Sequence, residues 1–220
     1  MSVPYDGVAP AQATGYLNAD RIGRGASILV CAVAGCQVLV TLEGWRQYAD
    51  SKDDPQSVNL GSLRPLDGVS FVLTLAAATL FIRWLRRARM NAESLCRARQ
   101  RHDRGWVIVG WFAPVFWFWI PKQIVDDIVI ASSPATPRDA ELLPMEQTPV
   151  VLIWWTAWLA GSLVNIPYPF LRPDPMTAAG LAGSAVFTTL STVFTVVAAV
   201  YAVRVIRYVN ELQASRSVAR

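Results

Sequence analysis

The sequence predicts an all-α membrane protein, a multi-pass bundle of transmembrane helices, and three observations support this prediction. Charged residues make up only 16% of the chain, whereas a soluble domain usually carries about 25%. The charges stand in short blocks between long uncharged runs, and the mean hydropathy is +0.33. Because proline breaks one of these apolar runs, we predict four full spans plus one re-entrant or tilted segment, with five full spans as the alternative.

This pattern excludes an ordinary soluble enzyme and a disordered protein, and it leaves no length for a separate globular domain. Residues 1–24 are predicted to form a flexible arm, without the basic start and early apolar run of a signal peptide. Residues 25–207 are predicted to form a single transmembrane helical domain, followed by a cytoplasmic tail over residues 208–220.

The first two apolar runs are predicted to cross the membrane as helices. The first covers residues 25–42, with Gln37 as its only strongly polar residue. The second covers residues 68–82 and is followed, as far as Arg104, by good helix formers without Gly or Pro. We therefore expect one long helix that continues from the membrane through the basic segment 83–104.

The third apolar run, residues 105–120, is not a simple span. It is short for a straight crossing, and Pro114 removes a backbone donor inside it, so the chain should kink or break there. Pro121 then begins an amphipathic helix over residues 122–132, with aliphatic residues on one face. The polar residues that share its other face are Lys122, Asp126 and Asp127.

The fourth and fifth apolar runs, residues 150–166 and 176–203, complete the bundle. If the third run dips in and returns, 16 of the 20 Lys and Arg residues share the side of both termini and 4 lie opposite. If all five runs cross, the split is 11 to 9. Because basic residues favour the cytoplasmic side, we predict the four-span arrangement with both termini cytoplasmic.

Sulfur and imidazole side chains form no catalytic or metal-binding pattern. Cys31, Cys36 and Cys96 are interpreted as small buried residues rather than as disulfide partners. His102 is the single histidine and is predicted to be solvated. With neither a phosphate-binding loop nor a GxSxG motif, we expect no enzyme, no cofactor, no metal site and no nucleic-acid binding.

Three blocks of residues follow one another in an order that resembles a known family. They are Arg87, Asn91, Ala92 and Leu95; then Trp111, Pro114, Pro121, Ile124, Val125, Asp127, Ala131 and Ser132; then Trp154 and Trp155. Over roughly residues 25–207, this order resembles the bacterial membrane-protein family named domain of unknown function 4328, frequent in actinobacteria. The chain departs from the family's pattern at residues 117–119, where Trp-Phe-Trp replaces an expected asparagine and fewer aromatics. The resemblance implies a bacterial plasma-membrane protein and carries no activity.

Polar residues near the membrane edges are candidate sites. The basic segment 83–104 is interpreted as a topology signal, or alternatively as a docking surface for anionic lipid or an acidic protein. Asn91, four residues beyond Arg87, is predicted to bind carbonyls that proline frees in the third run. Asp127 is interpreted as part of an exposed polar helix face, with a cation or proton site as the alternative.

Two side-chain patterns inside the apolar runs each allow two interpretations. The tryptophans nearer mid-run indicate core packing, or a pocket for an apolar ligand such as a lipid or quinone; they are Trp111, Trp117, Trp154, Trp155 and Trp158. Small and hydroxyl residues form a stripe on the fifth run, which indicates packing inside the monomer, or a homo-oligomer interface or pore wall. The stripe consists of Gly180, Ser184, Thr188, Thr192 and Thr195.

The sequence therefore predicts a non-enzymatic scaffold, sensor or accessory module in the lipid bilayer. The alternative is a small channel or transporter, formed by the bundle or by a homo-oligomer. One structural observation separates them, because transport requires that Asn91, Asp127 and the hydroxyl stripe converge on one polar path.

Overall fold

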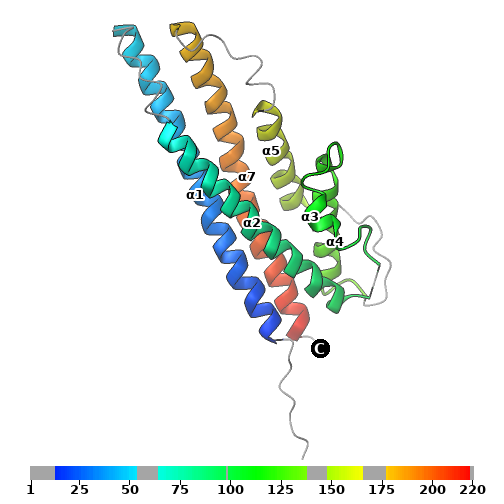
Figure 1. Ribbon diagram of the computed structural model, residues 1–220. Coiled ribbons are helices and arrows are strands. Elements are labelled where there is room, and N and C mark those ends of the chain that lie inside the picture. The colour runs from blue at the N-terminus through cyan, green and yellow to red at the C-terminus, as the bar shows by residue number, and fades with distance from the viewer. Residues whose placement is uncertain (1–12, 54–63, 98, 138–147, 166–176, 219–220) are drawn as a thin grey trace, which may run out of the picture.

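The computed structural model describes residues 13–53, 64–97, 99–137, 148–165 and 177–218 (Figure 1). All regular elements in these ranges are helices, which confirms the predicted fold class. In chain order they are α1 (Ala13–Asp53), α2 (Arg64–Leu95), α3 (Trp106–Val109), the 3-10 helix η3 (Phe116–Phe118), α4 (Ile120–Ser132), α5 (Pro149–Asn165) and α7 (Ala178–Val218).

Three long helices form the frame of the bundle. By length and composition α1, α2 and α7 are each able to cross a membrane, and α5 is a shorter apolar helix. The start of α1 and the end of α7 lie at the same end of the bundle (Figure 1), which we name the proximal end; the opposite end is the distal end. α1 packs along both α7 and α2, and α5 packs along α7 on the other side.

α1 is longer than the apolar run that predicts it. It begins inside the predicted arm, so that residues 13–24 are helical. The added turns pack closely against the rest of the bundle at Gly23. A Cβ atom there would lie 2.8 Å from Cγ2 of Ile206 and 3.0 Å from Cδ1 of Trp84. Contacts with neighbouring helices therefore extend α1 beyond its uncharged part.

α2 ends at Leu95, so the prediction of one helix through the whole basic segment is wrong. Beyond Leu95, side-chain contacts with other segments replace the backbone hydrogen bonds of the helix. Arg89 on α2 donates from Nη2 to the carbonyl of His102 at 2.6 Å, and Arg101 binds Asp127 on α4. These contacts turn the chain back along α2, which local helix propensity alone does not predict.

The third apolar run breaks at Pro114, as predicted. α3 is only four residues long, and beyond it Val115 adopts φ 70° and ψ −48°. The Phe116 amide donates to the Pro114 carbonyl at 2.8 Å, which makes a γ-turn that is rare and strained for a β-branched residue. α4 then returns toward the proximal end (Figure 1), so the chain reverses its direction within the broken segment.

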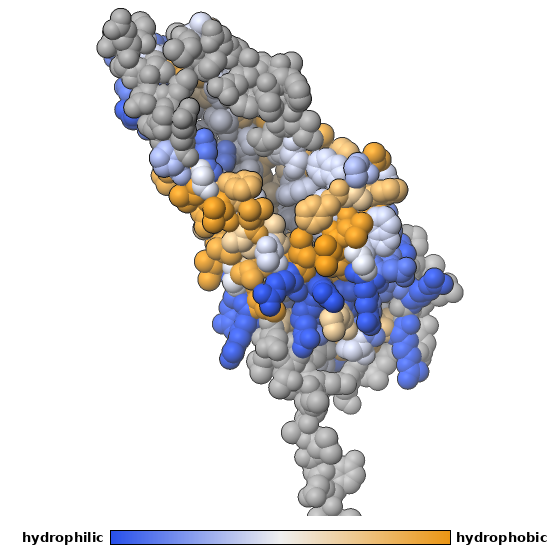
Figure 2. Space-filling model, viewed as in Figure 1, coloured by the Kyte–Doolittle hydropathy of each residue, from blue (hydrophilic) through white to orange (hydrophobic). Residues whose placement is uncertain are grey.

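The core lies in the proximal half, where α4 packs against α2, α5 and α7. Its largest fully buried apolar side chains include Trp84, Leu85, Ile124, Ile128 and Ile206. The aliphatic face predicted for α4 is buried throughout. Cys36 and Cys96 are buried, as predicted, whereas Cys31 is exposed. Outside the core, apolar residues form a band that hydrophilic residues border on the proximal side (Figure 2).

Candidate functional site

A groove lies between the long helices at the level of the apolar band. Its volume is about 570 Å³, and its walls come from α1, α2, α5, α7 and the broken segment 105–119. The space exists because alanines face it from three helices, namely Ala77, Ala78, Ala157, Ala198, Ala199 and Ala202. The groove reaches the surface beside α2, where its lining residues Thr74, Ala78 and Phe112 are exposed. The groove therefore opens on the side of the bundle beside α2.

The proximal part of the groove rests on a cluster of aromatic rings. The cluster consists of Phe81, Trp111, Trp117, Phe118, Trp154, Trp155 and Trp158. The rings of Trp155 and Trp158 stack with centroids 4.9 Å apart, and Trp155 donates from Nε1 to the carbonyl of Phe118 at 3.0 Å. Core packing, the first of the two interpretations, is confirmed for Trp154, which is buried. Trp154 also lines the groove, and its use as a ligand pocket stays a prediction.

Trp111 differs from its neighbours in the cluster. Its Nε1 is buried and has no hydrogen-bond partner among the described residues. Gly110, just before it, packs so closely that a Cβ atom would lie 2.9 Å from Cγ2 of Ile120. The break at Pro114 and this close approach together hold the Trp111 ring against α2 and α5, where it lines the groove.

The distal part of the groove carries uncharged polar side chains. They are Gln37, Ser70, Thr74, Ser162, Ser191 and Thr195. None of the lining residues is Asp, Glu, Lys, Arg, His or Cys. The groove thus offers hydrogen-bonding groups and apolar contact to a molecule that enters it.

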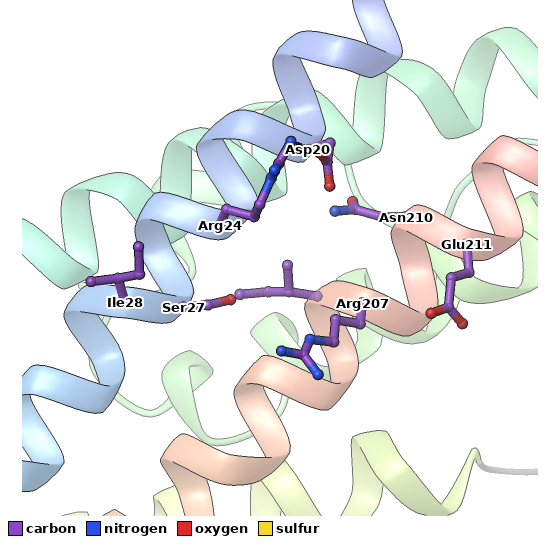
Figure 3. A pocket seen from close by; sticks show the side chains of 8 residues that line it. Asp20, Arg24, Ser27, Ile28, Arg207, Asn210 and Glu211 are labelled. Carbon is purple, nitrogen blue, oxygen red and sulfur yellow. Dashed lines mark hydrogen bonds and ion pairs between the residues drawn. The ribbon is translucent and has the colours of Figure 1, made fainter.

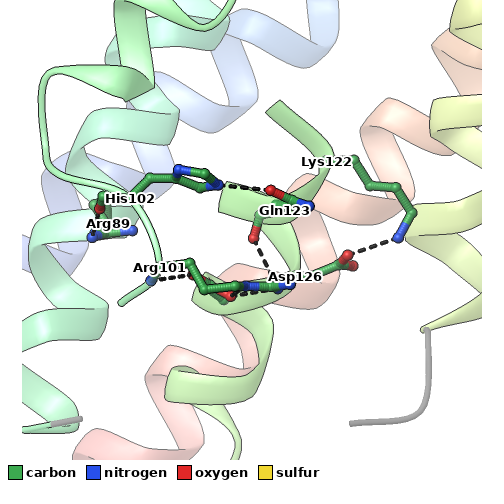
Figure 4. Close-up of polar contacts among 7 residues, drawn as sticks. Arg89, Arg101, His102, Lys122, Gln123 and Asp126 are labelled. Carbon is green, nitrogen blue, oxygen red and sulfur yellow. Dashed lines mark hydrogen bonds and ion pairs between the residues drawn. The ribbon is translucent and has the colours of Figure 1, made fainter. Parts of the chain in front are cut away.

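A polar network, which we name the polar clamp, surrounds the chain just before α3, and Figure 4 shows its members Arg89 and Arg101. Arg101 binds Asp127 through its backbone amide at 3.0 Å, through Nε at 2.7 Å and through Nη2 at 2.6 Å. Glu93 on α2 accepts from Nε of Arg89 at 2.8 Å and from Nε of Arg104 at 2.7 Å, and this partner raises the pKa of Arg104. The clamp joins α2, the turn before α3, and α4.

The structure corrects two predictions within this network. Asp127 is fully buried and is not part of an exposed polar face, because Arg101 reaches it from a segment remote in sequence. His102 is half-buried rather than solvated, with Nε2 hydrogen-bonded to Oε1 of Gln123 at 2.7 Å. Lys122 and Asp126 do lie on one helix face, as predicted, and Nζ of Lys122 is 2.7 Å from Oδ2 of Asp126.

A second buried polar cluster joins the end of α7 to α2 and α4. Asn91 donates from Nδ2 to Oε1 of Gln213 at 3.1 Å, so its predicted bond to carbonyls of the third run is wrong. Gln213 in turn donates to the Ala88 carbonyl at 2.8 Å and to Oγ of Ser132 at 3.2 Å. Arg216 donates to the Ala131 carbonyl near the end of α4 and to the Ser133 and Thr136 carbonyls beyond it, which suits a cation at a helix C-terminus.

Gln213 and Arg216 lie within residues 208–220, which the sequence predicts to be a cytoplasmic tail, and no site was predicted at either residue. The available signal was weak, since a glutamine and an arginine three residues apart are also typical of an exposed helix end. Both are buried, with Gln213 1% and Arg216 7% exposed. Their partners lie on α2 and α4, which only the tertiary fold brings within reach.

The hydroxyl stripe of α7 faces α1 for part of its length. The hydroxyl oxygens of Thr192 and Thr41 are 2.6 Å apart and hydrogen-bonded. Thr192 also donates to the Gln37 carbonyl at 3.4 Å. Gly180 is buried, whereas Ser184 and Thr188 are half-buried. The stripe thus supports helix packing within the chain, and its member Thr195 lines the groove.

The remaining candidate residues lie apart from the groove. Pro114 is exposed at the tip of the broken segment, Pro121 is buried at the start of α4, and Arg87 is half-buried on α2.

A smaller cleft of about 300 Å³ lies between α1 and α7 near the proximal end, where charged residues of both signs line it (Figure 3). Arg24 and Asp20, which line this cleft, pair with each other at 2.5 Å.

Long apolar helices, a proline-broken apolar segment and an uncharged lateral groove define a multi-pass integral membrane protein. The family model described as "Domain of unknown function (DUF4328)" matches residues 63–211, and the chain belongs to this family. The resemblance noted in the sequence is thereby confirmed from α2 to α7, whereas α1 lies outside the matched residues. Neither a curated protein nor a solved structure matches the chain.

Proposed function

We propose that this protein is a non-enzymatic membrane module, a sensor or scaffold that takes up a ligand from the lipid bilayer in its lateral groove. The observation that carries this proposal is the groove itself, which opens beside α2 within the apolar band and has an uncharged lining. A molecule dissolved in the bilayer reaches such a site without passing through water. The lining offers no titratable side chain to catalyse a reaction, which favours binding over enzymatic activity.

A channel or transporter receives less support from the same contacts. The three features that would have to share one polar path have separate partners: Asn91 binds Gln213, Asp127 binds Arg101, and the stripe contributes a bond to α1. Asn91 and Asp127 lie outside the groove lining. The pairing of hydroxyls within the chain also leaves the stripe less suited to a homo-oligomer interface or pore wall.

We also propose that α1, α2, α5 and α7 are the four spans, with both termini on the cytoplasmic side of a bacterial plasma membrane. The return of α4 toward the proximal end supports this topology, as does the excess of basic residues at that end. Maleimide labelling of a single cysteine introduced at Arg220 in intact cells tests it. Labelling from outside the cell would overturn the orientation.

The basic segment 83–104 supports a role at the cytoplasmic face of the membrane. Arg83, Arg86 and Arg99 are exposed, whereas the arginines of the polar clamp hold the fold together. We therefore propose that Arg83, Arg86 and Arg99, which lie outside the clamp, contact anionic lipid or an acidic protein partner. Each such residue contributes about 1 kcal/mol near an anionic leaflet, so replacing all three by glutamine should lower retention on phosphatidylglycerol vesicles.

Closing the mouth of the groove tests the proposed function directly. Ala78 lines the groove and is exposed at its mouth, so Ala78→Trp places an indole ring across the opening. Leu75→Trp is the matched control, because Leu75 is exposed on the same helix and does not line the groove. Native mass spectrometry of protein released from mild detergent should show a retained lipid on the wild type and on Leu75→Trp. Equal retention by Ala78→Trp would contradict the proposal.

A further inference from the structure

The groove is polar at one end and aromatic at the other. Its proximal part is lined by Phe81, Trp111 and Trp154, and its distal part holds the amide of Gln37 and several hydroxyl groups. The hydrogen bond from Thr192 to the Gln37 carbonyl places Gln37 on the distal side of the aromatic cluster, because α7 runs from the distal to the proximal end. A site graded in this way matches an elongated molecule with one polar end.

Gln37 is the strongest polar group in this site. It lies 13 residues beyond Arg24 and 9 before Arg46, which at the rise of an α-helix corresponds to about 20 Å and about 14 Å. The amide therefore sits inside a hydrocarbon layer that is about 30 Å thick. Its side chain has no hydrogen-bond partner within the described part of the chain, and unsatisfied polar groups are costly at this depth.

The nearby hydroxyls define what such a ligand must carry. Thr74 and Ser162 already donate to carbonyls of their own helices at 2.8 Å and 2.9 Å, so their remaining capacity is to accept. The amide nitrogen of Gln37 is a free donor, so a ligand can bind it through an oxygen atom that accepts a hydrogen bond. No cation lines the groove to neutralise a phosphate, and no anion lines it to pair with an amine.

We infer that the ligand is a neutral amphiphile, whose carbonyl-bearing head accepts a hydrogen bond from the side chain of Gln37 and whose tail lies along the aromatic cluster. This inference rests on the proposed function and adds the chemical class of the ligand. A diacylglycerol and an isoprenoid quinone share this chemistry, since both are uncharged and carry carbonyl oxygens at one end of a long apolar chain. The volume of about 570 Å³ is that of a site for one drug-sized molecule. The rest of a longer tail therefore leaves through the mouth beside Ala78 and Phe112.

Photolabelling of the full-length protein in phosphatidylcholine nanodiscs tests the ligand class. Three probes, each with a diazirine in its tail, are compared: a diacylglycerol, a quinone and a phosphatidylglycerol. Mass spectrometry of the peptides should find the diacylglycerol or the quinone, or both, on the lining residues of α2 and α5, with phosphatidylglycerol at background. The relative yield of the two neutral probes identifies the source of the head group.

Gln37→Leu removes the amide while it keeps the size of the side chain, and Val38→Leu, on the exposed face next to it, is the matched control. Loss of one neutral hydrogen bond should lower labelling by the neutral probe about three- to tenfold, whereas Val38→Leu should label as the wild type. Melting temperatures of all variants serve as the measure of correct folding. Unchanged labelling of Gln37→Leu, or equal labelling by phosphatidylglycerol, overturns the inference.

Ala78→Trp separates this inference from the proposed function on which it rests. If Ala78→Trp loses groove labelling and Gln37→Leu keeps it, the groove binds a ligand and only the assigned head group is wrong. If Ala78→Trp labels as strongly as Leu75→Trp with every probe, the groove is not a ligand site. Both proposals then fail together.

Discussion

Replacing Arg101 with methionine should destabilise the protein more than replacing its partner Asp127 with asparagine. The two ends of this ion pair differ in exposure, because the side chain of Asp127 is 0% exposed and that of Arg101 is 37% exposed. In Arg101→Met a buried carboxylate keeps only the backbone N–H bond, which corresponds to a loss of about 3 kcal/mol. In Asp127→Asn the amide oxygen still accepts a hydrogen bond and Arg101 remains partly solvated, so the loss is about 1 kcal/mol.

Thermal unfolding of the purified protein in detergent, followed by tryptophan fluorescence, measures this difference. For a chain of this length, a loss of 1 kcal/mol lowers the melting temperature by about 2–4 °C. We therefore expect a decrease of about 6–12 °C for Arg101→Met and about 2–4 °C for Asp127→Asn. Arg99→Met is the control, since Arg99 is exposed on the same segment, and its effect should stay within about 0.5 kcal/mol.

Two outcomes would refute this reasoning. The first is an equal melting temperature for Arg101→Met and Arg99→Met, which would show that the buried pair does not hold the segment before α3. The second concerns the double variant that combines Arg101→Met with Asp127→Asn. Because the uncompensated charge is gone, the double variant should be more stable than Arg101→Met alone. Simple addition of the two single losses would contradict burial of the charge as the cause.

Two further pairs of variants test the packing of the bundle. Gly23→Ala should lower the melting temperature, because the new Cβ would lie 2.8 Å from a side-chain carbon of α7; Gly35→Ala, with open space around it, should raise stability by up to about 1 kcal/mol. Trp155→Phe should destabilise the protein by about 1 kcal/mol, because it loses the bond to the Phe118 carbonyl. Trp111→Phe removes a buried N–H without a partner and should cost less, as melting curves of both variants would show.

The apolar helices and the break between them were predictable from uncharged runs and proline. Each of these features depends on its own segment and not on contacts with the rest of the fold. A run of apolar residues long enough to cross a membrane can be identified from its own length and composition. Pro114 breaks the helix because its ring and missing N–H are incompatible with a helix interior. The ends of the helices were not predictable in this way. α1 begins before its apolar run and α2 ends inside a run of good helix formers, since contacts with other helices decide both ends.

Only a few residues of the candidate site were predictable from the sequence, among them Trp111 and Trp154, and their arrangement was not. Gln37 stands out as the one strongly polar residue of the first run, and the tryptophans indicated either a core or a pocket. The cavity beside these residues exists because alanines from three different helices face it. Their small side chains leave space only where the three helices pack together, and the sequence does not show which helices do so. Asp127 shows the same limit, because its partner Arg101 is 26 residues away and no local pattern distinguishes a buried aspartate from an exposed one.

The polar clamp and the groove depend on each other through the broken segment. Residues 105–119 contain one four-residue helix, a strained γ-turn and a short 3-10 helix. Their backbone hydrogen bonds join residues close in sequence, so these bonds shape the segment but do not fix it against α2 and α4. The clamp holds the segment at both ends, through Arg101 and Arg104 before it and through Asp127 after it. Since Trp111 and Phe112 from this segment line the groove, a ligand that presses on them acts on the clamp as well. Arg101→Met should therefore weaken the proposed ligand binding although Arg101 does not line the groove, and such an effect would link the groove to the basic segment.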